Sequence, residues 1–276
     1  MTRVELVKLL RRPRTWIAIA LLCGLPAVVA AFLATTQVGP QPGEGPTFLS
    51  AVLANGSLYP AAALAMVLPL FLPVSVAVVG GDSVAGEAGA GMLRYLLLRP
   101  VGRTRLLVAK LVTLIAFVLI AVVSVAVTSY AVGVTVFGTE PADAFVGSAV
   151  VTSVSGTGLD QGQVALRIVY TVLYIAVSML GVGAIAIFLS TVTDSSLGAA
   201  LGALAFLVTS QVLVTLDAAT SIRPYLPTRY WLAWIDFFRE PILWHDIQRG
   251  LGIQAVYVGV FLAAAWANFA TRDVTS

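Results

Sequence analysis

Few side chains in this sequence could carry out bond chemistry. His245 is the only histidine and Cys23 the only cysteine, and they lie far apart in the chain. Neither a transition-metal cluster, nor a disulfide within the chain, nor a nucleophile activated by histidine is therefore predicted. No GxxxxGKS or GxxxxGKT phosphate loop occurs, so binding of ATP by that motif is not expected. The sequence predicts a protein that is not an enzyme and has no cofactor or metal of its own.

Polar residues inside the long apolar runs are the remaining candidates for a binding function. Polar groups are unfavourable in lipid, so such residues usually face protein or water. They either line a substrate path or form interhelical hydrogen bonds, which contribute roughly 0.6–2 kcal/mol each. The candidates are Ser124, Thr128, Tyr170, Tyr174, Ser178 and Gln211.

The composition is that of an integral membrane protein. Of 276 residues, 59% are hydrophobic and 11% charged, against about 45–50% and about 25% in soluble domains, and the mean hydropathy is +0.97. Six apolar runs come near the ~20 residues that a helix needs to cross the hydrocarbon. Prolines inside the first two runs predict kinks. We expect one all-α domain over 1–276 with spans at about 15–36, 58–81, 104–137, 164–190, 195–216 and 251–270.

Lysine and arginine are distributed unevenly between the two sides of these spans. If the N-terminus is cytoplasmic, eleven of the sixteen lie on the inner side. The positive-inside rule then places both termini in the cytoplasm and the chain in the cytoplasmic membrane as a multi-pass protein. The outer side holds Arg167, Arg223, Arg229, Arg239 and Arg249.

Residues 1–14 are expected to form an interfacial helix that ends at Pro13. A helical wheel separates an apolar side from a charged side, as in helices that lie on an anionic leaflet. The charged side holds Glu5, Lys8, Arg11 and Arg12. A signal peptide is the alternative, but the apolar run that follows is longer than usual and lacks a convincing small-x-small cleavage site.

The stretch from Ser83 to Lys110 separates the second and third spans and differs from both. It holds Glu87 and five basic residues beside a cluster of leucines. Asp82 or Ser83 can cap a helix here, and Pro100 must end it. Leu93 and Leu97 lie one turn apart, which is the anchor spacing of a helix bound in a groove. A helix resting on the lipid interface is the alternative.

The same stretch resembles the signature cytoplasmic loop of ABC-2 type permeases, the membrane subunits of type-2 ABC exporters. The matching positions are Gly86-Glu87, Gly91-Met92-Leu93, Leu96-Leu97, Pro100 to Arg103, and Lys110. Met92 and Gly102 replace the usual threonine and serine, and Ala88 and Gly89 replace charged residues. The resemblance implies that 82–103 forms a cytoplasmic coupling helix that inserts into a separate ATPase subunit. Its transmission contacts would be Gly86, Glu87, Leu93, Leu96, Leu97 and Arg103.

The segment 217–250 differs from the other two outer segments, which we expect to be irregular loops. Its aromatic stretches RYWLAWIDFF and ILWHDIQ flank Glu240 and Pro241. Two short helices at the outer interface are expected, and they resemble the extracellular helical hairpin that ABC-2 permeases carry before their last span. His245 is interpreted as an interfacial polar residue there, not as a ligand.

The resemblance implies that the chain is the permease of an ABC exporter, moving a hydrophobic or amphipathic substrate such as a lipid, peptide or drug outward. The implied partners are an ATPase subunit that holds ATP and Mg²⁺, a second permease that is identical or paralogous, and the lipid bilayer; nucleic acid is not expected. A membrane anchor that only recruits a soluble partner is one alternative. A secondary transporter is a less compatible one, because Arg167, Asp194 and Asp217 lie near the ends of spans.

Overall fold

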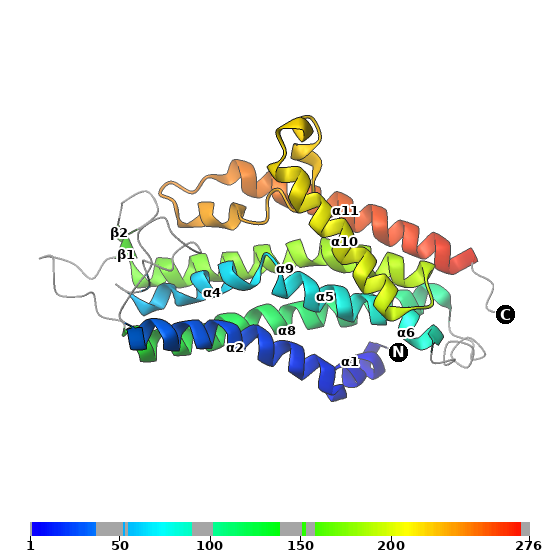
Figure 1. The fold of residues 1–276 in the computed structure, drawn as a ribbon, viewed down its shortest axis with the longest axis horizontal. Coiled ribbons are helices and arrows are strands. Elements are labelled where there is room, and N and C mark those ends of the chain that lie inside the picture. The colour runs from blue at the N-terminus through cyan, green and yellow to red at the C-terminus, as the bar shows by residue number, and fades with distance from the viewer. Residues whose placement is uncertain are drawn as a thin grey trace, which may run out of the picture.

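The computed structural model describes residues 2–36, 52, 55–89, 102–138, 151–152 and 158–271, most of them in long helices (Figure 1). Among these residues, five helices are long and apolar enough to cross a membrane, and a sixth span results if one bent pair is counted together. The expected all-helical membrane protein is confirmed. The five are α2 (Pro13–Thr36), α8 (Arg103–Phe137), α9 (Gln161–Val192), α10 (Ser196–Thr215) and α11 (Trp244–Thr271).

Local sequence signals set the ends of several spans close to the predicted bounds. α2 begins at Pro13, whose fixed φ and missing N–H suit a first helical turn. α9 begins at Gln161 and not at 164, because Asp160 and Gln163 form a reciprocal capping box. α10 begins behind Ser195, whose hydroxyl accepts the N–H of Gly198 at 3.1 Å.

The second predicted span, 58–81, is two helices and not one kinked helix. A 3-10 turn, η1 (Gly56–Leu58), leads into α4 (Tyr59–Val67), and α5 (Phe71–Asp82) follows at an angle of 58°. Pro69 lies in the break and has no N–H for the helical hydrogen bond. Pro73 lies in the first turn of α5, where that loss matters little.

α9 is the central helix of the bundle. It packs against α5, α8, α10 and α11, and its middle, from Ile175 to Ile187, is almost entirely buried. Small residues allow this close packing: a Cβ at Gly183 would lie 2.2 Å from a methyl carbon of Leu114 on α8. The core of the bundle therefore surrounds the fourth span.

The sequence predicted two short helices between α10 and α11, and the structure has 3-10 turns in most of this segment. It contains three 3-10 turns, η2 (Asp217–Ala219), η3 (Arg223–Tyr225) and η4 (Ala233–Phe238). The second expected helix is the beginning of α11, which starts at Trp244 and not near 251. The helical hairpin is thus corrected to a mainly 3-10 segment followed by one long last helix.

Side chains of α9 and α11 form hydrogen bonds to the segment between α10 and α11. The hydroxyl of Tyr174 on α9 donates to the Tyr230 carbonyl at 2.7 Å, and Nε2 of Gln254 on α11 donates to the Pro227 carbonyl at 2.7 Å. Buried Arg167 donates to the carboxylate of Glu240. These bonds satisfy polar groups of irregular backbone that would be costly to leave unpaired.

The segment between α8 and α9, expected to be an irregular outer loop, contains a small antiparallel pair of strands. β1 (Val151–Thr152) pairs with β2 (Gly158–Leu159) just before α9. The strands lie at one end of the bundle. α1 (Thr2–Arg11), the short α6 (Ala85–Gly89) and the end of α11 lie at the other end, here called the α6 end (Figure 1).

Candidate coupling site at the α6 end

The N-terminal helix turns charged residues toward the bundle. Glu5 and Leu9 are its buried residues, whereas Val4, Val7 and Leu10 are exposed by 68, 43 and 45%. The sequence predicted that Glu5 lies on a charged side facing an anionic leaflet, whereas the structure buries it against the bundle. Outward apolar side chains suit a helix whose outer face meets lipid.

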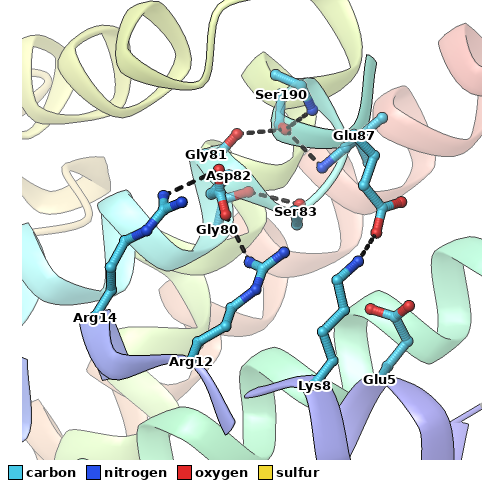
Figure 2. A network of polar contacts seen from close by, with 12 residues as sticks. Glu5, Lys8, Arg12, Arg14, Gly80, Gly81, Asp82, Ser83, Glu87 and Ser190 are labelled. Carbon is cyan, nitrogen blue, oxygen red and sulfur yellow. Dashed lines mark hydrogen bonds and ion pairs between the residues drawn. The ribbon is translucent and has the colours of Figure 1, made fainter. Parts of the chain in front are cut away.

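Four charged residues, Glu5, Lys8, Glu87 and Lys110, form a charge cluster where α1, α6 and α8 meet. Figure 2 shows three of them, Glu5, Lys8 and Glu87. Nζ of Lys110 donates to Oε2 of Glu5 at 2.8 Å and to Oε1 of Glu87 at 2.5 Å. Lys8 donates to the same oxygen of Glu87. Glu5, Glu87 and Lys110 are exposed by only 8, 2 and 5%. Two carboxylates and two ammonium groups balance, so the buried charges are compensated.

The charge cluster joins segments that are distant in the sequence. Glu87 belongs to the short helix that leads into 90–101, Lys110 belongs to a membrane-spanning helix, and Glu5 belongs to the N-terminal helix. Because a buried charge separated from its partner is strongly unfavourable, α6 cannot move far without α1 and α8. The three helices are therefore mechanically linked.

Glu87 stays ionised in this cluster. Burial alone would raise the pKa of its carboxyl group, but attraction and hydrogen bonds from Lys110 and Lys8 outweigh burial. The pKa of Glu87 therefore lies below its ordinary value of 4.5.

The stabilisation by Glu87 should be complete above about pH 4.5 and lost as the pH falls through the lowered pKa, because there the unfolded chain takes up a proton first. At pH 7, Glu87→Gln should lower the free energy of unfolding by about 1.5–3 kcal/mol, the range for hydrogen bonds to charged groups. The difference between wild type and variant should shrink below pH 4.5. Unfolding in detergent followed by tryptophan fluorescence measures it, and a difference that does not change with pH would contradict an ionised Glu87.

A second ion-paired group lies beside the charge cluster, where Asp82, the last residue of α5, meets Arg12 and Arg14 (Figure 2). Its Oδ2 accepts Nη1 of Arg12 at 2.6 Å, and its Oδ1 lies 3.7 Å from Nη1 of Arg14. Gly86 faces this carboxylate, and a Cβ there would lie 2.2 Å from Oδ1. A side chain at 86 would therefore push Asp82 away from both arginines. This explains why a glycine is needed at position 86.

The start of α6 is capped from another helix. The hydroxyl oxygen of Ser190 on α9 accepts the N–H groups of Val84 and Ala85 at 3.0 and 2.8 Å, and it donates to the Gly81 carbonyl at 2.7 Å (Figure 2). Ser190 is fully buried. One side chain of α9 thus fixes the turn between α5 and α6.

Neither of the predicted caps forms. Asp82 is held by the arginines, and the hydroxyl of Ser83 donates back to the Gly80 carbonyl at 2.6 Å. Gly86 and Glu87 lie in α6, and Arg103 is the first residue of α8. The predicted contacts Leu93, Leu96 and Leu97 lie outside the described residues, and so does the side chain of Arg103.

The ends of α8, α9 and α11 are also joined here. Nε1 of Trp266 donates to Oγ1 of Thr104 at 3.0 Å, and Nδ2 of Asn268 donates to the Thr191 carbonyl at 2.8 Å. Phe269 packs in a small buried cluster with residues on either side of 90–101. The residues directly before and after 90–101 are therefore packed against the ends of these helices.

The comparison with protein families supplies the deciding observation. The family model described as ABC-2 family transporter protein matches residues 2–227. The chain belongs to this family. The match covers α1, the charge cluster and the helices through α10, and a search of curated proteins found no match. Membrane subunits of the ABC-2 family are typically not catalytic and generally work with an ATPase.

The six candidate residues for a substrate path lie on three helices of this ABC-2 family member, α8, α9 and α10. On α8, Oγ1 of Thr128 donates to the Ser124 carbonyl at 2.7 Å, which is a bond within one helix. Gln211 is exposed on α10. The other three lie on α9, which packs against both α8 and α10.

The α9 candidates take part in packing. Tyr174 bonds the outer segment, and the hydroxyl of Ser178 donates to the Tyr174 carbonyl at 3.0 Å. The ring of Tyr170 lies 5.6 Å from that of Phe237. The bond of Ser178 lies within α9, and the contacts of Tyr174 and Tyr170 join α9 to the segment 217–243. A substrate role for these three residues stays a prediction.

Sequence reasoning missed part of this candidate site. It predicted no partner for Lys110, although a lysine between Ala109 and Leu111 in an apolar helix needs one. That signal could have marked Lys110, but its bond to Glu5 spans 105 positions. Ser190 had no signal, because a serine near a helix end is common.

Proposed function

We propose that this chain is the permease subunit of an ABC exporter, and that the stretch 83–103 docks together with α1 on a separate ATPase subunit. Family membership supports transport driven by such a partner. The charge cluster is the observation that carries the coupling role, because it links α6 to both α1 and α8. A displacement of the docking stretch would be passed directly to the third span.

Within this proposal, the leucines and the buried residues have different tasks. Leu93, Leu96 and Leu97 enter the ATPase cleft, whereas Glu87 acts inside the permease, where it is 2% exposed. ATP favours one of two packings of the bundle, since a ligand shifts an equilibrium only by its differential affinity for the two states. Closure of the ATPase pair moves α6, and the paired charges carry α1 and α8 with it.

The arrangement in the membrane follows from the charge distribution. Both termini and the α6 end are cytoplasmic, because eleven of the sixteen lysines and arginines then lie inside. A second permease completes the pathway, and the substrate is hydrophobic or amphipathic. Charges at span ends argue against a secondary transporter: Arg167 pairs with Glu240 of the outer segment, and Asp217 lies 3.5 Å from Arg223.

Leu97→Asp tests the docking role. We expect this variant to lose co-purification with a coexpressed ATPase subunit while still inserting in the membrane, because a carboxylate in an apolar cleft is desolvated without a partner. Leu243→Asp is the matched control. It changes an exposed leucine just before α11, at a position 48% exposed, and it should leave co-purification unchanged.

Normal recovery of the complex with Leu97→Asp, or equal loss with Leu243→Asp, would refute docking by this stretch. The anchor or scaffold alternative predicts the same co-purification but no transport. ATP-dependent accumulation of substrate in inverted vesicles, and stimulation of the ATPase by reconstituted permease, distinguish the two.

A further inference from the structure

An apolar groove of about 360 Å³ runs between α2 and α5. This volume falls within the ~300–1,000 Å³ of ordinary ligand pockets. Its walls include Ile17 and Leu21 of α2 and Phe71 and Val78 of α5. Ile17, Leu21 and Val78 are exposed by 59, 67 and 44%. The groove is therefore open to apolar molecules at the outside of the chain.

One end of the groove carries an excess of positive charge. Arg12, Arg14 and Asp82 line it there, so two guanidinium groups face one carboxylate. Arg12 holds Asp82 at 2.6 Å, whereas Arg14 lies at 3.7 Å and its side chain is 74% exposed. Arg14 thus keeps most of its donors available, and guanidinium groups bind phosphate in a planar, bidentate manner.

The length of the groove matches one leaflet of a bilayer. It extends along α5 from Phe71, the first residue, to Asp82, the last, and the helix has 12 residues. At ~1.5 Å per residue this is roughly 18 Å, close to half of the ~30 Å hydrocarbon core. The break between α4 and α5 ends the groove on one side, and the arginines lie at its other end. With the arginines at a membrane surface, that break would lie near the middle of the bilayer.

We propose that this groove binds one anionic phospholipid of the inner leaflet, with its phosphate on Arg14 and Arg12 and an acyl chain between α2 and α5. The charge excess, the apolar walls and the one-leaflet length favour a lipid over a soluble anion. A helix of a second permease would cover the walls but would leave the two arginines with Asp82 as their single anion. The site depends on the cytoplasmic placement of the α6 end and goes beyond the docking of an ATPase.

A competition experiment tests the site without any ATPase. The purified full-length chain is mixed in detergent with equal amounts of phosphatidylglycerol, phosphatidylethanolamine and phosphatidylcholine, and retained lipid is measured by native mass spectrometry. Wild type should retain phosphatidylglycerol in preference. Arg14→Gln should reduce this retention about tenfold, the effect of losing one charge-assisted hydrogen bond.

The matched control is Arg11→Gln, which removes the same charge from an exposed neighbour that does not line the groove; it should retain lipid like wild type. Val78→Trp should fill the groove and expel the lipid while Arg14 stays in place. Because Arg14 makes only the longer contact to Asp82, its variant should elute and melt like wild type, so lost retention reports on binding and not on folding.

Three results would overturn the proposal. Wild type could show no preference for the anionic lipid, or Arg11→Gln could lose retention as strongly as Arg14→Gln, which would indicate general surface charge. Alternatively, Val78→Cys in a Cys23→Ser background could form a disulfide-linked dimer in membranes, which would show that a second copy covers the groove.

Discussion

Replacing Lys110 by alanine should lower the free energy of unfolding by about 3–5 kcal/mol, the range observed when one partner of a buried ion pair is removed. Lys110 bonds both carboxylates of the charge cluster, and it is 5% exposed. Without it, Glu5 loses its bond inside the bundle, and Glu87 keeps only Lys8. The folded fraction in detergent and the stimulation of the ATPase partner by reconstituted permease should fall together.

Arg105→Ala is the control for this variant. Arg105 is a cation five positions earlier on the same helix, but it is exposed, and exposed substitutions usually change stability by less than about 0.5 kcal/mol. If Lys110→Ala unfolds like Arg105→Ala, the charge cluster does not exist as described. A triple variant, Glu5→Met, Glu87→Met and Lys110→Met, should recover much of the stability, because replacement of a buried ion-pair group by hydrophobic residues of similar volume is often near neutral.

The spans could be predicted because their signals are local. A run of apolar residues long enough to cross the hydrocarbon must be a helix to satisfy its backbone, and caps such as Asp160 and Ser195 then fix the ends. The break in the second span was not predictable in the same way. Proline tolerates either a kink or a full interruption, and the packing of α5 against α9 and α10 decides between them.

The burial of Glu5 on the charged side of α1 could not be predicted from the residues of that helix alone. The helical wheel placed Glu5 opposite the leucines, but Glu5 and Leu9 are buried together on one face of α1. This burial depends on Lys110 and Glu87, which are brought to α1 only by the folded bundle. The outer segment is similar: bonds from Tyr174 and Gln254 hold its irregular backbone, and no pattern within 217–243 contains them.

Gly133→Ala should destabilise the protein by about 3 kcal/mol, the upper part of the range for overpacking a well-packed site. Gly133 on α8 touches Gly56 at the start of η1. A Cβ at 133 would lie 2.3 Å from the Gly56 carbonyl oxygen and 2.5 Å from Cβ of Tyr59. Both obstacles are backbone or next to it, so η1 and α4 must shift as a unit.

The shift has a local readout. The hydroxyl of Tyr59 donates to the Pro26 carbonyl and links α4 to α2, so Gly133→Ala should also weaken that link. A second substitution, Tyr59→Phe, should then destabilise the alanine variant less than it destabilises wild type, as expected for neighbouring sites that share one contact. Unfolding of the four proteins in detergent, followed by tryptophan fluorescence, gives the coupling.

Gly24→Ala is the matched control, since it makes the same chemical change in the interior of α2, where nothing lies within 4 Å of an added Cβ. There the alanine should raise stability by about 0.5–1 kcal/mol through its better helix propensity. Opposite signs for the two substitutions would establish that the contact of Gly133 with Gly56, and not glycine itself, holds the two helices together. Equal effects of the same sign would show that α8 and η1 are farther apart than the structure has them.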